Sequence, residues 1–456
     1  MTIDKEGPKY DRIAIIGGGP AGLAAAKALA YEPINFKTID LYERRDKLGG
    51  LWYHHGDKTK LHPSVPSVNQ YSREMTSEGA LKEDIYTSAI YKYMETNIVY
   101  PIMEYNQVYF PRNSRIYPLR QSVLDYIEEY IKSMPESVNF NLNSNIISVE
   151  KVNDVWQVKV EDEEVKEYDA VVIANGHFNT PYIPDVPGLK EWNEHLSNTI
   201  SHSKYYQSPN DYKNKTVLVI GNAASGVDLS TQISTVAKKV YVSVRDKSKL
   251  TLKNSLIDYI GMVEEYNHTD KSVITRDGET VNGIDSVIFC TGYFYSFPFL
   301  KLDNILTDGR QVQNIYKQIF NIQDPSISFV ALLKNFLPMP VSEYQSSLIA
   351  RVYSGRYKLP NEEEMKEDYE IEMIKKGKGS PFHDFSFPKD IDYCEHLKSL
   401  IETQNCLQSG LIGPLWTKEK IYYRSQTKIQ KEERLRDLIE HVKQLRKEGK
   451  DFSLLN

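Results

Sequence analysis

Short apolar runs, each followed by a glycine-rich turn, mark the predicted strands of this chain. Residues 12–16 (RIAII) and 215–220 (KTVLVI) are almost free of charge, which is typical of parallel strands buried on both faces. Residues 23–32 (LAAAKALAYE) follow the first turn and predict a helix. Second strands are predicted at 37–43 (KTIDLYE) and 239–245 (KVYVSVR). This order predicts an α/β fold with two Rossmann-like dinucleotide-binding domains.

The charged C-terminal stretch predicts an amphipathic helix that docks on the rest of the protein. Residues 427–450 carry apolar side chains at helical spacing, namely Leu435, Leu438, Ile439, Val442 and Leu445. Contact with a membrane is the alternative for such a helix, and we favour docking. No apolar run approaches the roughly 18 residues of a membrane span, so no membrane partner is expected. The charged N-terminus is unlike a signal peptide, so a cytoplasmic location is expected.

Composition and charge narrow the classes of function. The 456 residues suggest two or three domains, and the net charge of −6 gives no sign of a nucleic-acid partner. The three cysteines, Cys290, Cys394 and Cys406, include no CxxC pair, which argues against a disulfide framework and a structural zinc site. The ten histidines show no HExxH spacing, so no metal site is predicted.

The first glycine turn has the spacing of a phosphate-binding turn. Gly17, Gly19 and Gly22 follow the strand at 12–16 in GxGxxG order. The first glycine permits a tight turn, the second lets the backbone approach a pyrophosphate, and the third lets helix and strand pack closely. The phosphates then lie on the helix N-terminus, where N–H groups and the helix dipole favour negative charge. A glycine turn that serves only helix packing is the alternative.

An acidic residue completes this first pattern. Glu43 ends the second predicted strand, 21 residues after Gly22, where an acid accepts hydrogen bonds from a ribose hydroxyl. Strand, glycines, helix, strand and acid together predict a dinucleotide site, which also includes Pro20 and Ala21 of the turn.

The second glycine turn differs at its middle position, where Ala223 replaces glycine in a GxAxxG pattern. One extra methyl group still leaves room for a phosphate to approach. Ser225 is predicted to donate a hydrogen bond to that phosphate, with capping of the helix as the alternative. The predicted nucleotide contacts in this turn are Gly221, Asn222, Ala224, Ser225 and Gly226.

Arg245 indicates which nicotinamide nucleotide fits the second site. It ends the predicted strand at 239–245, 19 residues after Gly226, where an NAD site would have Asp or Glu. A guanidinium at this point pairs with the 2′-phosphate of NADPH, and Lys247 lies close behind it. Asp246 is the feature that speaks for NADH. We therefore favour NADPH as the second cofactor.

Several longer motifs resemble the flavin-containing monooxygenases, most closely the shorter fungal members. The resemblance extends over roughly residues 10–355 and is carried by GGGPAGL, ERRDKLGGLWYH, ETNIVYPIMEY, YPLRQSVLDYI, VVIANGHFNTPYIPDVPG, IFCTGYFYSFPFL and MPVSEYQSSLIARV. It implies FAD in the first site and NADPH in the second. Together with the two turns, it predicts a discontinuous FAD-binding domain, residues 1–178 and 289–456, with an inserted NADPH-binding domain at 179–288.

The resemblance also assigns roles to residues outside the two turns. Gly49 and Gly50 lie where the backbone contacts the flavin side of the cofactor in such proteins. Glu343 and Arg351 match polar residues near the cofactors. The further cofactor-binding residues that it implies are Gly50, Leu51, Trp52, Thr96, Asn97, Thr291, Gly292 and Gln345.

The identifying motif of the family, FxGxxxHxxx[YF], is only partly matched by residues 196–206 (LSNTISHSKYY). His202 and Tyr206 agree with the motif, whereas Leu196 replaces Phe and Asn198 replaces Gly. The motif belongs to a domain linker and its role is conformational, so the replacements do not by themselves remove cofactor binding. His202 is interpreted as a hydrogen-bonded linker histidine.

Two related enzyme classes are disfavoured. Baeyer–Villiger relatives end a similar motif in HxxxW, whereas this chain has Tyr206 followed by Gln207. Disulfide-reductase relatives need paired redox cysteines, and Cys394 and Cys406 are neither adjacent nor in CxxC spacing. Cys290 lies in an apolar run and is interpreted as a packed strand thiol.

The activity that the resemblance implies is a two-stage cycle. NADPH passes hydride to the flavin, and reduced flavin then takes up O₂ to form a C4a-hydroperoxide. A soft nucleophile, which is a thiol, thioether or amine, attacks its terminal oxygen. Asn97 is the predicted catalytic residue because an amide donates and accepts hydrogen bonds without titrating. An ordinary turn asparagine is the alternative for Asn97.

Other questions stay open at the level of sequence. An NADPH oxidase or flavin reductase without productive oxygen transfer is the alternative enzyme, and a nucleotide-sensing module without flavin is the alternative outside enzymes. Residues 54–79 predict a long irregular loop over the substrate entrance. The oligomeric state is undetermined, with a homodimer as one option.

Overall fold

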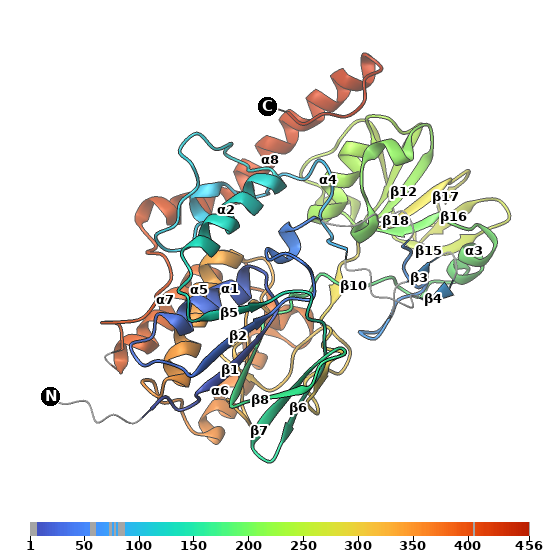
Figure 1. The fold of residues 1–456 in the computed structure, drawn as a ribbon. Coiled ribbons are helices and arrows are strands. Elements are labelled where there is room, and N and C mark those ends of the chain that lie inside the picture. The colour runs from blue at the N-terminus through green and yellow to red at the C-terminus, as the bar shows by residue number, and fades with distance from the viewer. Residues whose placement is uncertain are drawn as a thin grey trace. The chain divides into compact units, whose positions relative to one another are not determined.

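The chain folds into two units, each assembled from three separate segments (Figure 1). The structure is a computed structural model that describes residues 7–54, 61–72, 75–76, 79–80, 87–404 and 406–455. Unit 1 contains residues 1–53, 98–177 and 295–426. Unit 2 contains residues 54–97, 178–294 and 427–456.

Unit 1 is built on a seven-stranded sheet with the strand order β21-β22-β23-β9-β1-β2-β5. β1 lies in the middle and pairs in parallel with β2 and β9, so that Ile15 stands opposite Leu41 on one side and Val172 on the other. The sheet strands are β1 (Arg12–Ile16), β2 (Thr38–Tyr42), β5 (Val138–Asn141), β9 (Ala170–Ile173), β21 (Ile315–Tyr316), β22 (Phe320–Asn321) and β23 (Ile327–Phe329). A smaller sheet contains β6 (Ile146–Val152), β7 (Val155–Val160), β8 (Val165–Tyr168) and β20 (Leu300–Lys301).

The helices of unit 1 pack on this sheet and on one another. α5 is buried along almost its whole length and packs against α1, the helix that follows the first glycine turn. The α-helices are α1 (Pro20–Ala30), α2 (Arg120–Lys132), α5 (Pro338–Tyr353), α6 (Glu362–Lys376) and α7 (Lys389–Thr403). The short 3-10 helices are η1 (Gly50–Trp52), η3 (Tyr100–Ile102) and η7 (Ser380–His383).

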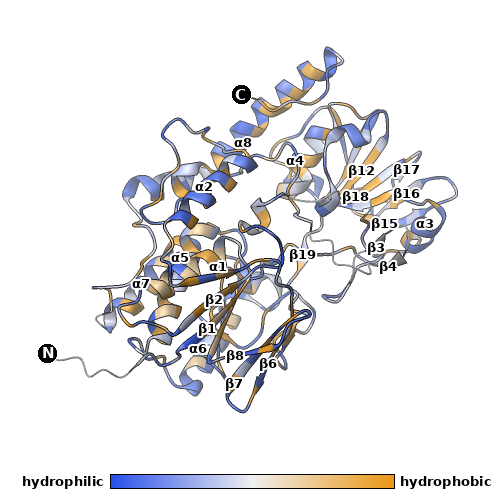
Figure 2. Cartoon of the chain, viewed as in Figure 1, coloured by the Kyte–Doolittle hydropathy of each residue, from blue (hydrophilic) through white to orange (hydrophobic). Residues whose placement is uncertain are grey.

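Unit 2 is built on a five-stranded parallel sheet with the order β11-β18-β12-β13-β14. Its strands are β11 (Ile200–His202), β12 (Thr216–Ile220), β13 (Lys239–Ser243), β14 (Ile257–Ile260) and β18 (Ser286–Phe289). Figure 2 shows β12 and β18 in the orange of apolar side chains, which matches their complete burial over most positions. Such strands are typical of a sheet covered on both faces.

Further elements complete unit 2. Its helices are α3 (Leu189–His195), α4 (Ala224–Ile233), η4 (Ser203–Tyr205), η5 (Pro209–Tyr212) and η6 (Lys247–Lys249). Its short strands are β3 (Met75–Thr76), β4 (Gly79–Ala80), β10 (Thr180–Pro181), β15 (Val263–Asn267), β16 (Ser272–Thr275), β17 (Thr280–Val281) and β19 (Tyr293–Phe294).

The predicted C-terminal helix is confirmed and is longer than expected. α8 extends over Lys418–Lys447, so it begins before the stretch at 427–450 that suggested it. Its apolar face packs within unit 2, where Leu438 and Val442 share a buried cluster with Phe452. Among the described residues, no helix has both the length and the apolar character that crossing a bilayer requires.

The predicted strands are confirmed to within two residues at each end, as β1, β2, β12 and β13. The helix predicted at 23–32 begins earlier, at Pro20, because proline suits the first helical position. The predicted domain boundaries near 178 and 289 lie close to the unit boundaries after residues 177 and 294. Residues 54–97 and 427–456, which the sequence analysis placed in the first domain, group with unit 2 instead. Of the predicted loop at 54–79, residues 55–60, 73–74 and 77–78 lie outside the described residues.

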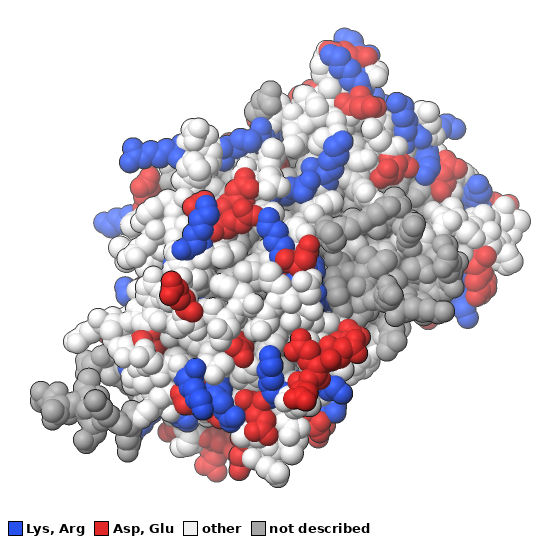
Figure 3. Space-filling view, viewed as in Figure 1, with Lys and Arg blue, Asp and Glu red and all other residues white. Residues whose placement is uncertain are grey.

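Figure 3 shows basic and acidic side chains mixed over the face in view. This mixture agrees with a chain in which 56 Lys and Arg residues stand against 62 Asp and Glu residues.

A buried carboxyl group lies on α5 in the core of unit 1. Glu343 accepts hydrogen bonds from the Asn106 backbone N–H (2.6 Å) and from the Tyr130 hydroxyl (2.9 Å). Burial raises the pKa of Glu343 to about 8, although these two bonds and the nearby Lys27 work in the opposite direction. The unfolded group ionises near pH 4.5, so the folded state binds an extra proton between pH 4.5 and about 8. The free energy of unfolding should fall as pH rises through this window.

Glu343→Gln should remove this pH dependence, because the isosteric amide can accept from Asn106 N–H and donate to the Tyr130 oxygen. The wild-type loss is on the order of 5 kcal/mol across the window, so the variant should unfold at a higher temperature than wild type at pH 8. Thermal unfolding midpoints from pH 5 to 9 measure this, with the exposed Glu363→Gln on α6 as the control. Equal pH slopes for wild type and Glu343→Gln would show that Glu343 is ionised in the fold.

Candidate functional site

The first glycine turn connects β1 to α1 in unit 1. Gly17 has φ +115°, and a Cβ on Gly22 would lie 1.8 Å from the Gly17 carbonyl oxygen. A larger residue at position 22 would therefore push the helix away from the strand. α1 has no side-chain cap and no acidic residue in its first turn, so its terminal N–H groups suit an anionic ligand. Pro20 and Ala21, which the sequence analysis included in the nucleotide site, form the first turn of this helix.

Glu43 ties the end of β2 to the first glycine turn. The Gly18 N–H donates to Glu43 Oε2 at 2.9 Å, and this side chain is buried. The Arg45 N–H and Nε both donate to the other oxygen, Oε1, at 3.1 Å and 3.3 Å. A carboxylate has about four acceptor positions, so capacity for a ribose hydroxyl remains.

Arg45 is a positioning residue that the sequence analysis missed. Its Nη1 donates to the Tyr53 carbonyl at 3.1 Å, and its Nη2 donates to the Gly50 carbonyl at 2.5 Å. The fork of one guanidinium thus connects Glu43 to the segment that begins at Gly49. Its position two residues after the acid of the second strand was the available signal.

The segment at Gly49 and Gly50 comes close to the first glycine turn. The Gly49 N–H donates to the Gly18 carbonyl at 2.9 Å, and a Cβ on Gly50 would lie 2.5 Å from Gly19 Cα. Leu51 and Trp52 follow in η1. The predicted residues from the first turn, Glu43 and this segment therefore lie together. An uncapped helix end, a cradle of glycine backbone and a carboxylate fit the pyrophosphate and ribose of a dinucleotide.

The second glycine turn repeats this geometry in unit 2. Gly221 has φ +103°, and a Cβ on Gly226 would lie 2.0 Å from the Gly221 carbonyl oxygen. Ala223 is the N-cap of α4, which has neither a side-chain cap nor an acidic residue in its first turn. Ser225 lies inside the helix at an exposed position and does not cap it. The N-terminus of α4 is thus also suited to an anion.

Arg245 lies two residues beyond β13 and is exposed. Within the described part of the chain it has no hydrogen-bond or ion-pair partner. Lys247 differs, because its Nζ lies 2.8 Å from Asp277 and 3.4 Å from Glu279. Asp246 is engaged locally, since it accepts from the Ser248 N–H at 2.9 Å and from its hydroxyl at 2.6 Å. Of these charged side chains, Arg245 is the one available to a phosphate.

The predicted residues of the two crossings and of the Thr-Asn pair lie in unit 2. Thr96 is buried, whereas Asn97 is exposed. The Thr291 hydroxyl donates to the Tyr182 carbonyl, and the Tyr182 N–H donates to the Gly292 carbonyl at 2.9 Å. These bonds join the two crossings of the chain between the units, which pair as β10 and β19.

The polar residues of α5 are engaged within unit 1. Gln345 is fully buried, accepts from the Ala331 N–H at 2.9 Å and donates to the Tyr393 hydroxyl at 3.0 Å. Arg351 donates to backbone carbonyls at Ser347, Cys406, Ser409 and Leu411. These contacts favour a role in positioning the surrounding loops over direct contact with a cofactor. Glu343 also has its hydrogen-bond partners, Asn106 and Tyr130, within unit 1.

The structure explains one of the two replacements in the motif at 196–206, that of glycine by Asn198. Asn198 has φ +60°, a left-handed conformation that glycine adopts freely and asparagine tolerates better than other residues. Leu196 packs against the buried cluster that contains Trp192. His202 is fully buried, and its Nδ1 accepts from the Lys204 N–H at 3.2 Å. Burial lowers the pKa of His202 to about 3, so this ring is neutral at ordinary pH.

Comparison with known proteins identifies the family. A match to the family described as flavin-binding monooxygenase-like covers residues 10–262 and 252–414. The chain belongs to this family. It is therefore a flavin monooxygenase. The predicted family and the predicted α/β fold with two Rossmann-like domains are confirmed.

Relatives of this monooxygenase resemble it over most of its length. The thiol-specific monooxygenase of Saccharomyces cerevisiae is 28% identical over an alignment of 461 positions, which covers 97% of each chain. Flavin-containing monooxygenase FMO GS-OX4 of Arabidopsis thaliana is 32% identical over an alignment of 382 positions, which covers 79% of this chain and 77% of that one. The structure of S-allyl-L-cysteine S-oxygenase from Allium sativum matches with a TM-score of 0.76 and 27% identity, over 96% of this chain and 98% of that one.

The thiols of the monooxygenase are all buried and free. Burial raises the pKa of Cys290 to about 12, and burial also raises the pKa of Cys394. Neither residue is a thiolate at ordinary pH, which agrees with the interpretation of Cys290 as a packed strand thiol. The described residues include no group of three or more His, Cys, Asp or Glu that could hold a metal ion.

Arg45→Gln should weaken flavin retention, because the variant loses the bonds from the guanidinium to Glu43 and to the Gly50 carbonyl. The expected rise in the flavin dissociation constant is about tenfold, which corresponds to ~1.4 kcal/mol. Flavin absorbance per chain after dialysis measures it. Lys47→Gln is the matched control, since Lys47 pairs with Glu128 at the surface. Wild-type retention by Arg45→Gln would contradict the positioning role.

Proposed function

We propose that the protein is an NADPH- and FAD-dependent monooxygenase that transfers one oxygen atom from O₂ to soft nucleophiles, with sulfur compounds as the main class. The observation that carries the proposal is the pair of uncapped helix ends, on α1 and α4, each behind a turn in which a Cβ could not be placed. Two such sites in a flavin monooxygenase suit one flavin and one nicotinamide nucleotide.

Sulfur as the atom oxidised is supported by the relatives. The yeast relative is named for its specificity for thiols, and the garlic relative is named for oxygenation of S-allyl-L-cysteine. Both resemble this chain over 96–97% of its length. Thiols and thioethers are therefore the first substrates to test, and amines are the third class that the proposal includes.

NADPH as electron donor is supported by the charges behind β13. Arg245 has no partner among the described residues, whereas Lys247 and Asp246 are both engaged. A guanidinium pairs well with a dianionic 2′-phosphate, and the hydroxyl of NADH offers no such partner.

Division of labour between cofactor and protein follows from the residue types present. When bound, the flavin supplies the redox chemistry, in which it takes electrons from NADPH and activates O₂. The chain would hold the pyrophosphate at the N-terminus of α1, orient a ribose with Glu43 and offer the amide of Asn97. An amide keeps its hydrogen-bonding character at every pH, so Asn97 would not deliver a proton at the wrong moment.

The central experiment gives the purified protein NADPH and O₂ with a panel of thiols, thioethers and tertiary amines. Oxygenated product, NADPH consumed and hydrogen peroxide released are measured in parallel. We expect product in near-stoichiometric ratio to NADPH with the sulfur compounds. Consumption of NADPH that yields only peroxide with every compound would contradict oxygen transfer and identify an oxidase.

Asn97→Ala should keep its flavin and its reduction by NADPH, while product per NADPH falls by about tenfold or more, as expected for loss of one stabilising hydrogen bond near the reacting atoms. Peroxide should rise by the amount that product falls. Asn282→Ala, at an exposed position of unit 2, is the matched control. An unchanged ratio of product to NADPH would remove Asn97 from the mechanism.

Arg245→Gln should raise the KM for NADPH about tenfold or more and leave the KM for NADH almost unchanged, because only NADPH carries the 2′-phosphate. Steady-state kinetics with both nucleotides measures this. Lys249→Gln is the control, since Lys249 is largely exposed and pairs only loosely with Asp246 at 3.6 Å. Equal changes in both KM values would contradict the assignment of Arg245.

A further inference from the structure

The segment that carries Asn97 is held in place by side chains. Residues 91–97, here called the strap, contain no helix and no strand. Backbone hydrogen bonds join Lys92 N–H to the Gln207 carbonyl at 3.1 Å and Met94 N–H to the Tyr91 carbonyl at 3.2 Å, and Glu95 lies in an isolated β-bridge. Side chains of the strap add contacts with two helices to this backbone bonding.

One side of the strap is fastened to α4. The Tyr91 hydroxyl donates to the Asp228 carboxylate, and the Tyr91 ring packs edge-on against Tyr206 with 5.2 Å between ring centroids. Gln232, one turn after Asp228, donates to its Oδ1 at 3.1 Å. α4 is the helix whose N-terminus follows the second glycine turn.

The other side of the strap is fastened to the C-terminal helix α8 by a bidentate ion pair. Arg434 Nε lies 2.8 Å from Glu95 Oε1, and Nη2 lies 2.8 Å from Oε2. Both side chains are largely buried, and Nη2 also donates to the Leu455 carbonyl at 2.9 Å. The Tyr93 ring adds an edge-on contact with Phe452 at 5.1 Å. A planar fork of this kind fixes orientation as well as distance, which a lysine cannot do.

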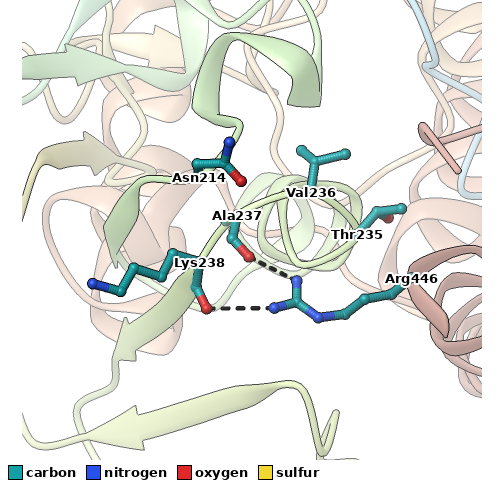
Figure 4. A pocket seen from close by; sticks show the side chains of 6 residues that line it. All are labelled: Asn214, Thr235, Val236, Ala237, Lys238 and Arg446. Carbon is teal, nitrogen blue, oxygen red and sulfur yellow. Dashed lines mark hydrogen bonds between the residues drawn. The ribbon is translucent and has the colours of Figure 1, made fainter. Parts of the chain in front are cut away.

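α8 is itself anchored to α4, so the strap has a firm support. Arg446 Nη1 donates to the carbonyls of Ser234 (2.6 Å) and Ala237 (2.7 Å), at the C-terminal end of α4. Figure 4 shows this guanidinium, in a pocket beside Asn214, with its bonds to Ala237 and Lys238. A cation at this end also complements the helix dipole. The strap, α4 and the part of α8 that belongs to unit 2 (residues 427–447) thus form one assembly.

We propose that Arg434 is a positioning residue for oxygen transfer, which holds Glu95 and thereby fixes the place of Asn97 two residues further on. The inference rests on the proposed function of Asn97. Its consequence is that a residue near the C-terminus controls the yield of oxygenated product without touching flavin, nucleotide or substrate. The nucleotide-binding helix and the amide of Asn97 are then carried by the same rigid group of elements.

The test compares Arg434→Met and Arg434→Lys with wild type in the holoenzyme. Three quantities are measured, namely the rate of flavin reduction by NADPH, the ratio of thioether sulfoxide to NADPH consumed, and the thermal midpoint. For Arg434→Met we expect flavin reduction within about twofold of wild type and a fall of about fivefold in the product ratio, matched by peroxide, because the bidentate contact is lost. The product ratio of Arg434→Lys should lie between those of wild type and Arg434→Met, because lysine keeps the positive charge and loses the bidentate contact.

The control is Arg436→Met on the same helix, where the side chain is exposed, and it should match wild type. A double variant separates positioning from general loosening. In an Asn97→Ala background, Arg434→Met should cause no further fall in the product ratio, because the two residues act through one group. An additive further fall would overturn the proposal.

Failure of this inference can be told apart from failure of the proposed function. If Asn97→Ala lowers the product ratio while Arg434→Met does not, the positioning role is overturned and the proposed function stands. If Asn97→Ala leaves the ratio unchanged, the role of Asn97 falls, and the positioning role of Arg434 falls with it.

Discussion

The close contact between each glycine turn and the helix that follows it is the constraint on which the rest of the structure depends. At Gly22 and at Gly226 a Cβ would lie 1.8 Å and 2.0 Å from the carbonyl oxygen at the start of the same turn. Such distances allow only glycine, and they bring the helix N-terminus to the carboxyl end of the sheet. The two units reach this arrangement separately, and unit 2 does so with Ala223 in the middle position.

Polar side chains around these turns serve mostly to hold backbone segments. Arg45 connects the acid after β2 to the segment at Gly50, and Arg351 fastens residues 406–411. Gln345 uses both ends of its amide inside unit 1. Because these groups already have partners, the function that we propose leaves the chemistry to the cofactors, to backbone N–H groups and to Asn97. This distribution suits an enzyme whose reactive step belongs to its flavin.

The local sequence pattern predicts those parts of the fold that depend mainly on residues close together in the chain. Four strands, two glycine turns and the C-terminal helix follow from apolar runs, glycine spacing and helical periodicity. The assignment of residues 54–97 to unit 2 could not be predicted, because it depends on contacts such as Tyr91 with Asp228 and Glu95 with Arg434. These partners are 137 and 339 positions apart in the sequence. The local sequence around one partner does not identify the other.

The candidate site shows the same limit. The residues of the first turn and Glu43 lie together as their spacing predicts, and the segment from Gly50 joins them as the family resemblance implies. The hydrogen bonds of Gln345 depend instead on partners far away in the sequence. At Asn198 the structure explains a residue that the sequence motif had made look unfavourable. Its departure from the motif looked like a loss, yet its φ of +60° is a conformation in which asparagine replaces glycine at low cost.

Burial of the three thiols has a consequence for the durability of the protein. A flavin monooxygenase works beside reactive oxygen species, and any leak of peroxide reaches its own sulfur atoms first. Thiolates at the surface are oxidised fastest, whereas a protonated thiol inside a packed core is slow to react. Cys290 and Cys394 are both kept protonated by their surroundings, so these two thiols react slowly with any peroxide that is released.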